Sequence, residues 1–146
     1  CYEQYAEALK GALAKVPAGA VDLLTALLGK GLTVALVSRN NSAAVRAVFA
    51  GTQSEKLIIL HEAVNAIRFC SWDCLLRAAR KNDLHERLCV AVAGSGISVK
   101  GALISGLGVM VKVNPVTEYQ DISGCDFHIS EFSAGLADEV TRILRI

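Results

Sequence analysis

The residues best suited to chemistry follow a short apolar run in the first third of the chain. Ser38, Arg39, Asn40 and Asn41 come directly after the β-branched run at residues 32–37. A hydroxyl, a guanidinium and two amides at a strand end, in front of a helix, can bind phosphate oxygens together with backbone N–H groups. The same residue types also form turns and helix caps that bind nothing, so both interpretations stay open.

A second candidate is the glycine turn Gly94-Ser95-Gly96, which follows the apolar run at residues 88–93. A strand, a glycine turn and a helix can bind a dinucleotide, but the spacing here is G-x-G-x-x-x-x-G, and Lys100 has no G-K-[ST] context. A dinucleotide site also needs an acidic residue at the end of the next strand. The sequence has lysine, valine and asparagine there, so a tight crossover turn is favoured over a nucleotide-binding loop.

The histidines and cysteines do not have the spacing of a metal site. Cys70 and Cys74 lie one helical turn apart, and His128 follows Cys125 by three residues, but neither pair has a second ligand pair. No G-x-S-x-G elbow surrounds Ser95, so triad hydrolysis has no support either. Five cysteines at irregular spacings predict reduced thiols in an intracellular, reducing compartment.

Apolar runs and amphipathic stretches alternate along the chain and indicate the elements that position these residues. Short apolar runs predict strands, and apolar residues spaced by three and four predict helices. The predicted strands are residues 32–37, 56–60, 88–93, 109–113 and 127–129. The predicted helices are residues 2–15, 20–30, 42–49, 72–81, 98–105 and 133–144. This alternation predicts an α/β fold, a three-layer sandwich around a mostly parallel, Rossmann-like sheet.

Composition supports one domain with a large core. Of the 146 residues 53% are apolar and 20% are charged, which excludes disorder and fits either a helical bundle or a parallel sheet covered on both faces. No apolar run is longer than residues 88–93, so no membrane span is expected. Fifteen basic and fourteen acidic residues give a net charge of +1, without the basic surface that nucleic acid or an anionic membrane requires.

The order of these segments resembles the haloacid dehalogenase-like (HAD) phosphohydrolase superfamily, of the phosphoglycolate phosphatase type. The resemblance rests on residues 17–24, 34–41, 73–79, 89–95, 101–106 and 124–129. It implies a HAD-like sheet and a phosphoaspartyl mechanism. In that mechanism a D-x-D motif supplies the nucleophile and the acid/base, a Ser or Thr and a Lys hold the phosphoryl group, and a G-D-x-x-x-D stretch holds Mg²⁺.

The phosphate-binding motifs of the family are only partly present. Ser38 matches the Ser or Thr position, with Asn40 and Asn41 beside it as further phosphate-binding candidates. The lysine position falls on Cys70 and Ser71. The nearest cation is Arg68, which fits that position only if the loop shifts by about two residues.

The metal motif is degenerate. It falls on the turn that contains Gly94, Ser95 and Ser98, with Gly94 and Ser98 where the two Asp residues are expected. Consequently no catalytic residue is intact, and no metal ligand is predicted from this chain.

The resemblance places the D-x-D strand and the cap before residue 1, so residues 1–146 are expected to form one HAD-like core domain that is incomplete at its N-terminus. The missing strand belongs between the strands at residues 32–37 and 88–93. An upstream segment or a protein partner is therefore expected to complete the sheet, unless the sheet closes over the gap. Each orphaned backbone group in a buried sheet costs on the order of 1 to 3 kcal/mol.

Two functions follow from the resemblance. The first is a catalytically degenerate HAD-like domain that acts as a binding or assembly module, without Mg²⁺-dependent phosphatase chemistry and without a cofactor. The alternative is a phosphohydrolase acting on a small phosphate ester. It needs Mg²⁺ and an upstream nucleophilic Asp, and would use Ser38, Asn41 and Arg68.

Overall fold

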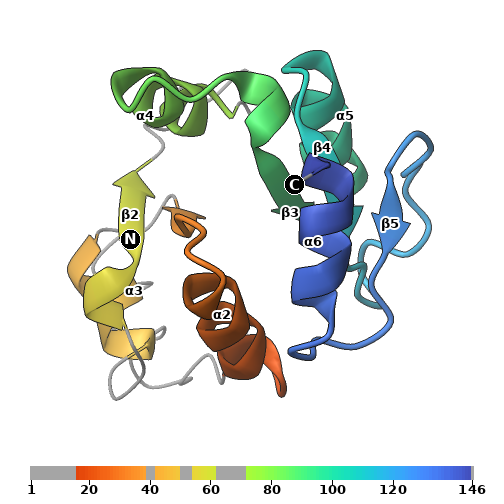
Figure 1. Cartoon of the computed structure of the whole chain (residues 1–146). Coiled ribbons are helices and arrows are strands. Elements are labelled where there is room, and N and C mark those ends of the chain that lie inside the picture. The colour runs from red at the N-terminus through yellow and green to blue at the C-terminus, as the bar shows by residue number, and fades with distance from the viewer. Residues whose placement is uncertain (1–15, 39–41, 50–53, 62–71, 146) are drawn as a thin grey trace, which may run out of the picture.

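The computed structural model describes residues 16–38, 42–49, 54–61 and 72–145 (Figure 1). The helices are α2 (Ala20–Gly29), α3 (Ser42–Val48), α4 (Asp73–Lys81), α5 (Gly96–Ile104) and α6 (Leu136–Leu144). The strands are β1 (Ala35–Ser38), β2 (Ile58–His61), β3 (Val90–Ala93), β4 (Gly108–Val111) and β5 (Phe127–His128), and the 3-10 turns are η1 (Ser54–Lys56) and η2 (Glu86–Leu88). The helix expected at residues 2–15 lies outside the described residues.

The strands are all parallel, as predicted, and the fold is α/β. They form two sheets instead of one: β1 pairs with β2, and β3, β4 and β5 pair in that order. Figure 1 shows β1 and β2 on the left, β3, β4 and β5 on the right, and α4 across the top. Among the described strands no hydrogen bond joins β1 to β3, so the two sheets are separate hydrogen-bonded units.

One face of the three-stranded sheet packs into a group of buried side chains that we call the Trp72 cluster. Its members are Trp72, Ala91, Ala93, Val99, Ala102, Leu107, Val109 and Val111. Alternate residues of β3 and β4 supply the sheet side of the cluster and α5 supplies the helix side, as the twofold repeat of a strand requires. Val37 of β1 and Leu75 and Leu76 of α4 pack against the same cluster, which therefore extends across both sheets.

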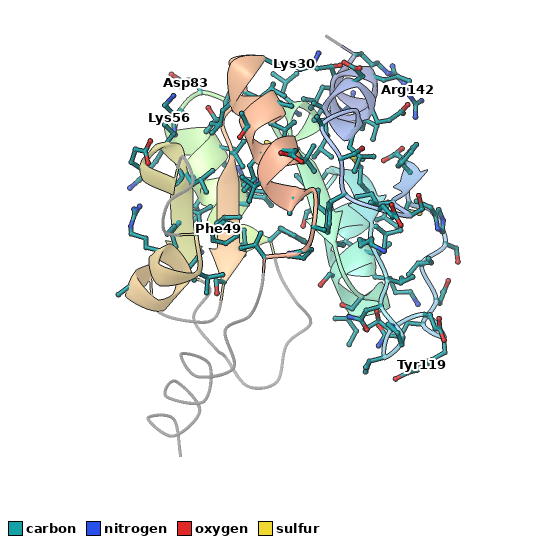
Figure 2. The ribbon with its side chains drawn as sticks, turned by 90° about the horizontal axis from the view of Figure 1, so that it is seen from below. Lys30, Phe49, Lys56, Asp83, Tyr119 and Arg142 are labelled. Atoms are coloured by element: carbon teal, nitrogen blue, oxygen red, sulfur yellow. The ribbon has the colours of Figure 1, made fainter. Side chains whose placement is uncertain are left out.

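The other face carries the Met110 cluster. Its buried members are Leu23, Leu27, Met110, Ile129, Leu136, Ala137 and Val140, with Val34 and Val90 packed against them. Helices α2 and α6 cover this face, and an ion pair of 2.9 Å between Lys30 and Asp138 joins them. Figure 2 shows Lys30 at the end of α2 that faces α6. Two apolar layers enclosing the strands confirm the predicted sandwich.

Several predicted boundaries are wrong by two or three residues. α5 begins at Gly96 and not at residue 98, because Ser95 caps it. β2 and β3 begin at residues 58 and 90, because η1 and η2 precede them. α6 begins at Leu136 and not at residue 133, after a turn. None of the helices that the structure describes is long and apolar enough to cross a membrane.

Candidate functional site

The candidate site lies at the carboxyl ends of the strands, where ligands bind in open α/β sheets. Ser38 is the last residue of β1 and is partly exposed. Asn40, Asn41 and Arg68 lie outside the described residues, so the predicted phosphate loop is described only at Ser38. The glycine turn after β3 belongs to the other sheet and is described in full.

The turn between β3 and α5 brings together two of the predicted positions, Ser95 and Ser98. Ser95 has an extended backbone and is the N-cap of α5, and its Oγ accepts a hydrogen bond from the N–H of Ser98 at 3.3 Å. The two hydroxyl oxygens lie 3.1 Å apart and are also hydrogen-bonded. The two serines thus serve as hydrogen-bond partners for each other, as is common at a helix N-cap.

The N–H of Gly96, the first residue of α5, has a hydrogen-bond partner that was not predicted from the sequence. The amide oxygen of Gln120 accepts a hydrogen bond from the N–H of Gly96 at 2.8 Å. Gly96 is buried, and a Cβ atom there would lie 2.5 Å from the carbonyl oxygen of Asp121. Only glycine permits this close approach of the loop. Gln120 therefore occupies the place at the helix N-terminus where an anion would bind.

Lys100 forms an ion pair with the loop that contains Gln120. Its ammonium lies 3.0 Å from Asp121, whose carboxylate also accepts hydrogen bonds from the hydroxyl and the N–H of Ser123. The hydrogen bonds from Ser123, and then the nearby Lys100, hold the pKa of Asp121 well below its usual range. Asp121 is therefore ionised at neutral pH and forms an ion pair with Lys100. The spacing Asp-x-Ser is an Asx-turn signal that could have identified this loop.

Trp72 connects the start of α4 to this turn. Its indole Nε1–H donates a hydrogen bond of 3.0 Å to the carbonyl oxygen of Ser98, and the residue is only 8% exposed. The bond anchors the first turn of α5 against the Trp72 cluster.

The donor set of the turn does not fit Mg²⁺. This ion prefers carboxylate oxygens and water in octahedral geometry, and residues 94–98 contain only glycine, serine and isoleucine. Across the described part of the chain, no three His, Cys, Asp or Glu side chains gather where they could hold a metal ion.

Cysteine chemistry is also disfavoured at the two described thiols. Cys89 and Cys125 are free, and burial raises the pKa of each thiol. Both are therefore protonated and weakly nucleophilic at neutral pH. Cys1 and Cys70 lie outside the described residues, and of Cys74 in α4 only the backbone is described.

The substitution Gln120→Ala is expected to lower the free energy of unfolding by about 1 kcal/mol, because it leaves the N–H of Gly96 without its acceptor. Gln120→Glu keeps an acceptor and adds negative charge at a helix N-terminus, so it is expected to preserve stability. Urea denaturation of both variants measures the difference. Equal losses in the two variants would show that the contact with Gly96 is not what stabilises the loop.

No protein-family model and no curated protein matches the sequence. CbbY from Rhodobacter sphaeroides in complex with phosphate matches with a TM-score of 0.76 and 22% identity, over 92% of this chain and 64% of that chain. A CbbY mutant in complex with xylulose-1,5-bisphosphate matches with a TM-score of 0.75 and 20% identity, over 90% and 63%.

A HAD hydrolase of family IA, variant 3, from Entamoeba histolytica has a TM-score of 0.68 and 18% identity, over 99% of this chain and 71% of that chain. The chain thus spans 63% and 64% of the two CbbY chains, less than two thirds of each. These likenesses extend over both sheets and establish the fold that the sequence pattern predicted.

Proposed function

Taking the haloacid dehalogenase-like fold as the premise, we propose that this domain is a binding or assembly module that has lost Mg²⁺-dependent phosphatase chemistry. The observation that carries the proposal is the closed turn between β3 and α5. Gly96 donates to Gln120, Ser98 donates to Ser95, and Lys100 is paired with Asp121. These three donor groups of the turn thus already have partners within the protein.

The chemistry of phosphoryl transfer supports the same conclusion. An anionic nucleophile attacking an anionic phosphate ester needs a divalent cation to offset the repulsion. The two positions where the HAD resemblance requires carboxylates are Gly94 and Ser98, and neither side chain carries a charge. An Asp nucleophile supplied from elsewhere would therefore still lack the ligands that hold the ion.

The alternative function is a phosphohydrolase for a small phosphate ester, with an upstream Asp as nucleophile. The observation in its favour is that HAD hydrolases, and CbbY in complex with phosphate, share the fold of this chain. In this alternative Ser38, Asn41 and Arg68 hold the phosphoryl group. We also propose that the domain binds a protein partner in a reducing compartment, and that it binds neither nucleic acid nor a membrane.

A phosphatase assay on the full-length natural protein tests the choice. We expect that a panel of small phosphate esters is hydrolysed no faster than without protein, with or without millimolar Mg²⁺. Ser38→Ala should leave this background unchanged. Robust Mg²⁺-dependent turnover that Ser38→Ala abolishes would contradict the proposal and establish the phosphohydrolase.

A further inference from the structure

The outward face of α4 carries a row of basic side chains. Leu75 of α4 packs against the Trp72 cluster and Ala79 is buried, so these two residues define the inward face of the helix. Residues three and four apart share a helix face. Arg77, Arg80 and Lys81 have this spacing, and all three are exposed. The face of α4 opposite the cluster is therefore basic.

The turn that follows α4 adds a fourth cation and two exposed leucines. The N–H of Leu84 donates to the carbonyl oxygen of Ala79, which holds the turn against the end of α4, and η2 contacts the helix. The N–H of Arg87 donates a hydrogen bond of 3.2 Å to Nδ1 of His85. Leu84 is 38% exposed and Leu88 is 49% exposed. We call this region the α4–η2 surface, and its members are Arg77, Arg80, Lys81, Leu84, Arg87 and Leu88.

The four cations of the α4–η2 surface take part in none of the ion pairs that join described residues. By contrast, Lys30, Lys100 and Arg142 each pair with a carboxylate of the chain. The basic groups of this surface are thus available to a carboxylate from another molecule.

Glu86 is the acid of η2, and its position brings two of the cations together. A backbone hydrogen bond chiefly, and then the charges of His85, Arg80 and Arg87, lower the pKa of Glu86. Arg80 of α4 and Arg87 of η2 therefore lie near the same carboxyl group. The side chain of Glu86 also lies against Gly106, where an added Cβ atom would be 3.5 Å from its Cγ atom. Glu86 thus extends toward the turn between α5 and β4.

The composition of the α4–η2 surface favours an acidic peptide as its ligand. An arginine guanidinium can bind a carboxylate through two parallel hydrogen bonds, and arginine is enriched in protein interfaces. Leu84 and Leu88 offer apolar area that a side chain of the peptide can cover. Nucleic acid fits less well, because Asp83 and Glu86 interrupt the basic residues and the net charge of the chain is only +1.

We propose that the α4–η2 surface binds an acidic, leucine-containing segment of a protein partner. The inference rests on the binding role proposed above and names the chemistry of the partner. Figure 2 shows Asp83, which follows α4, at the opposite end of the molecule from Tyr119 on the loop after β4. Because the surface lies away from that loop, peptide binding and phosphatase activity can be tested separately.

Fluorescence anisotropy of a labelled peptide of glutamate and leucine tests the proposal on the full-length natural protein. We expect saturable binding at low salt that weakens as the salt concentration is raised. The same peptide with glutamine in place of glutamate should not bind. In an NMR titration with the acidic peptide, the amide signals of Arg80, Arg87 and Leu88 should shift, whereas those of Gly96 and Ser98 should not.

Two double variants locate the binding. Arg80→Gln/Arg87→Gln should weaken the affinity for the acidic peptide about 10-fold, since it removes two cations that pair with the ligand. The matched control is Arg142→Gln/Arg145→Gln, which makes the same change in net charge at exposed positions near the end of α6. The control should bind the peptide as the unaltered protein does. Leu88→Ser should weaken binding without changing the net charge.

Three outcomes would overturn the proposal. The first is the absence of saturable binding of the acidic peptide. The second is an equal loss of affinity in the two double variants, which would show attraction by net charge alone. The third is tighter binding of single-stranded DNA or of phosphatidylserine vesicles that Arg80→Gln/Arg87→Gln removes, which would assign the surface to nucleic acid or to a membrane. Phosphatase activity together with intact peptide binding would overturn the proposed loss of chemistry and leave this surface assigned.

Discussion

The double substitution Gly94→Asp/Ser98→Asp is expected to give the β3–α5 turn a Mg²⁺ dissociation constant on the order of 1 mM, whereas the unaltered chain shows no saturable binding. Gly94 has room for a side chain, since the nearest atom to an added Cβ is the carbonyl oxygen of Lys112 at 3.8 Å. Ser98 is the third residue of α5, where a carboxylate interacts favourably with the helix dipole. The change therefore supplies two carboxylates without breaking the turn.

Isothermal titration calorimetry with Mg²⁺ measures the gain. The matched control is Gly94→Asn/Ser98→Asn, which has the same shape without charge and should not bind the ion. Equal weak heats in the two variants would mean that missing carboxylates do not explain the absence of a metal site. The geometry of the turn would then be the cause.

The second large effect is expected from Trp72→Ala, which should lower the free energy of unfolding by about 3–5 kcal/mol. Trp72 is 8% exposed, belongs to the cluster that extends across both sheets, and donates to the carbonyl oxygen of Ser98. Trp72→Phe keeps most of the buried ring but loses the donor, so it should cost about 1–2 kcal/mol. Chemical denaturation measures both values.

Tyr119→Ala is the control for removing an aromatic ring. Tyr119 is 79% exposed on the loop after β4, where Figure 2 shows it at the periphery, so the substitution should change stability by less than about 0.5 kcal/mol. A loss for Trp72→Ala no larger than that for Tyr119→Ala would show that the Trp72 cluster does not hold the domain together.

The elements that rest on long apolar patterns were predictable from the sequence. Helix α2 was expected at residues 20–30 and α4 at residues 72–81, and both agree with the structure to within one residue at each end. Leu136 and Val140 lie four residues apart on α6, the spacing that predicts one apolar face, and both are buried. On α2, Leu23 and Leu27 have the same spacing and are buried in the same cluster.

Strand ends were less predictable because apolar residues also pack outside the ladder. Leu32 and Val34 belong to a β-branched run and pack on the Met110 cluster. They precede β1, since the N–H of Leu32 closes the end of α2 by donating to Leu27. An apolar run indicates which residues are buried. Where the strand itself begins depends on the neighbouring strand with which it forms hydrogen bonds.

The site was predictable only where its contacts are local. Ser95 and Ser98 are three residues apart, so their mutual hydrogen bonds follow from the capping pattern. Gln120 is 24 residues from Gly96, and its contact depends on how the loop after β4 folds back. No periodicity marks such a residue. Asp121 and Lys100 are separated in the same way, so the neutralisation of Lys100 could not be inferred either.

We propose that side chains of the protein itself occupy the turn between β3 and α5, so that the turn binds neither Mg²⁺ nor phosphate. The most direct test is an NMR titration of the full-length natural polypeptide with Mg²⁺ and inorganic phosphate, together and separately. We predict that the amide signals of Gly96 and Ser98 show no saturable shift up to millimolar concentrations. A saturable shift of these two signals that requires both ions would contradict the account and place a working phosphate site at this turn.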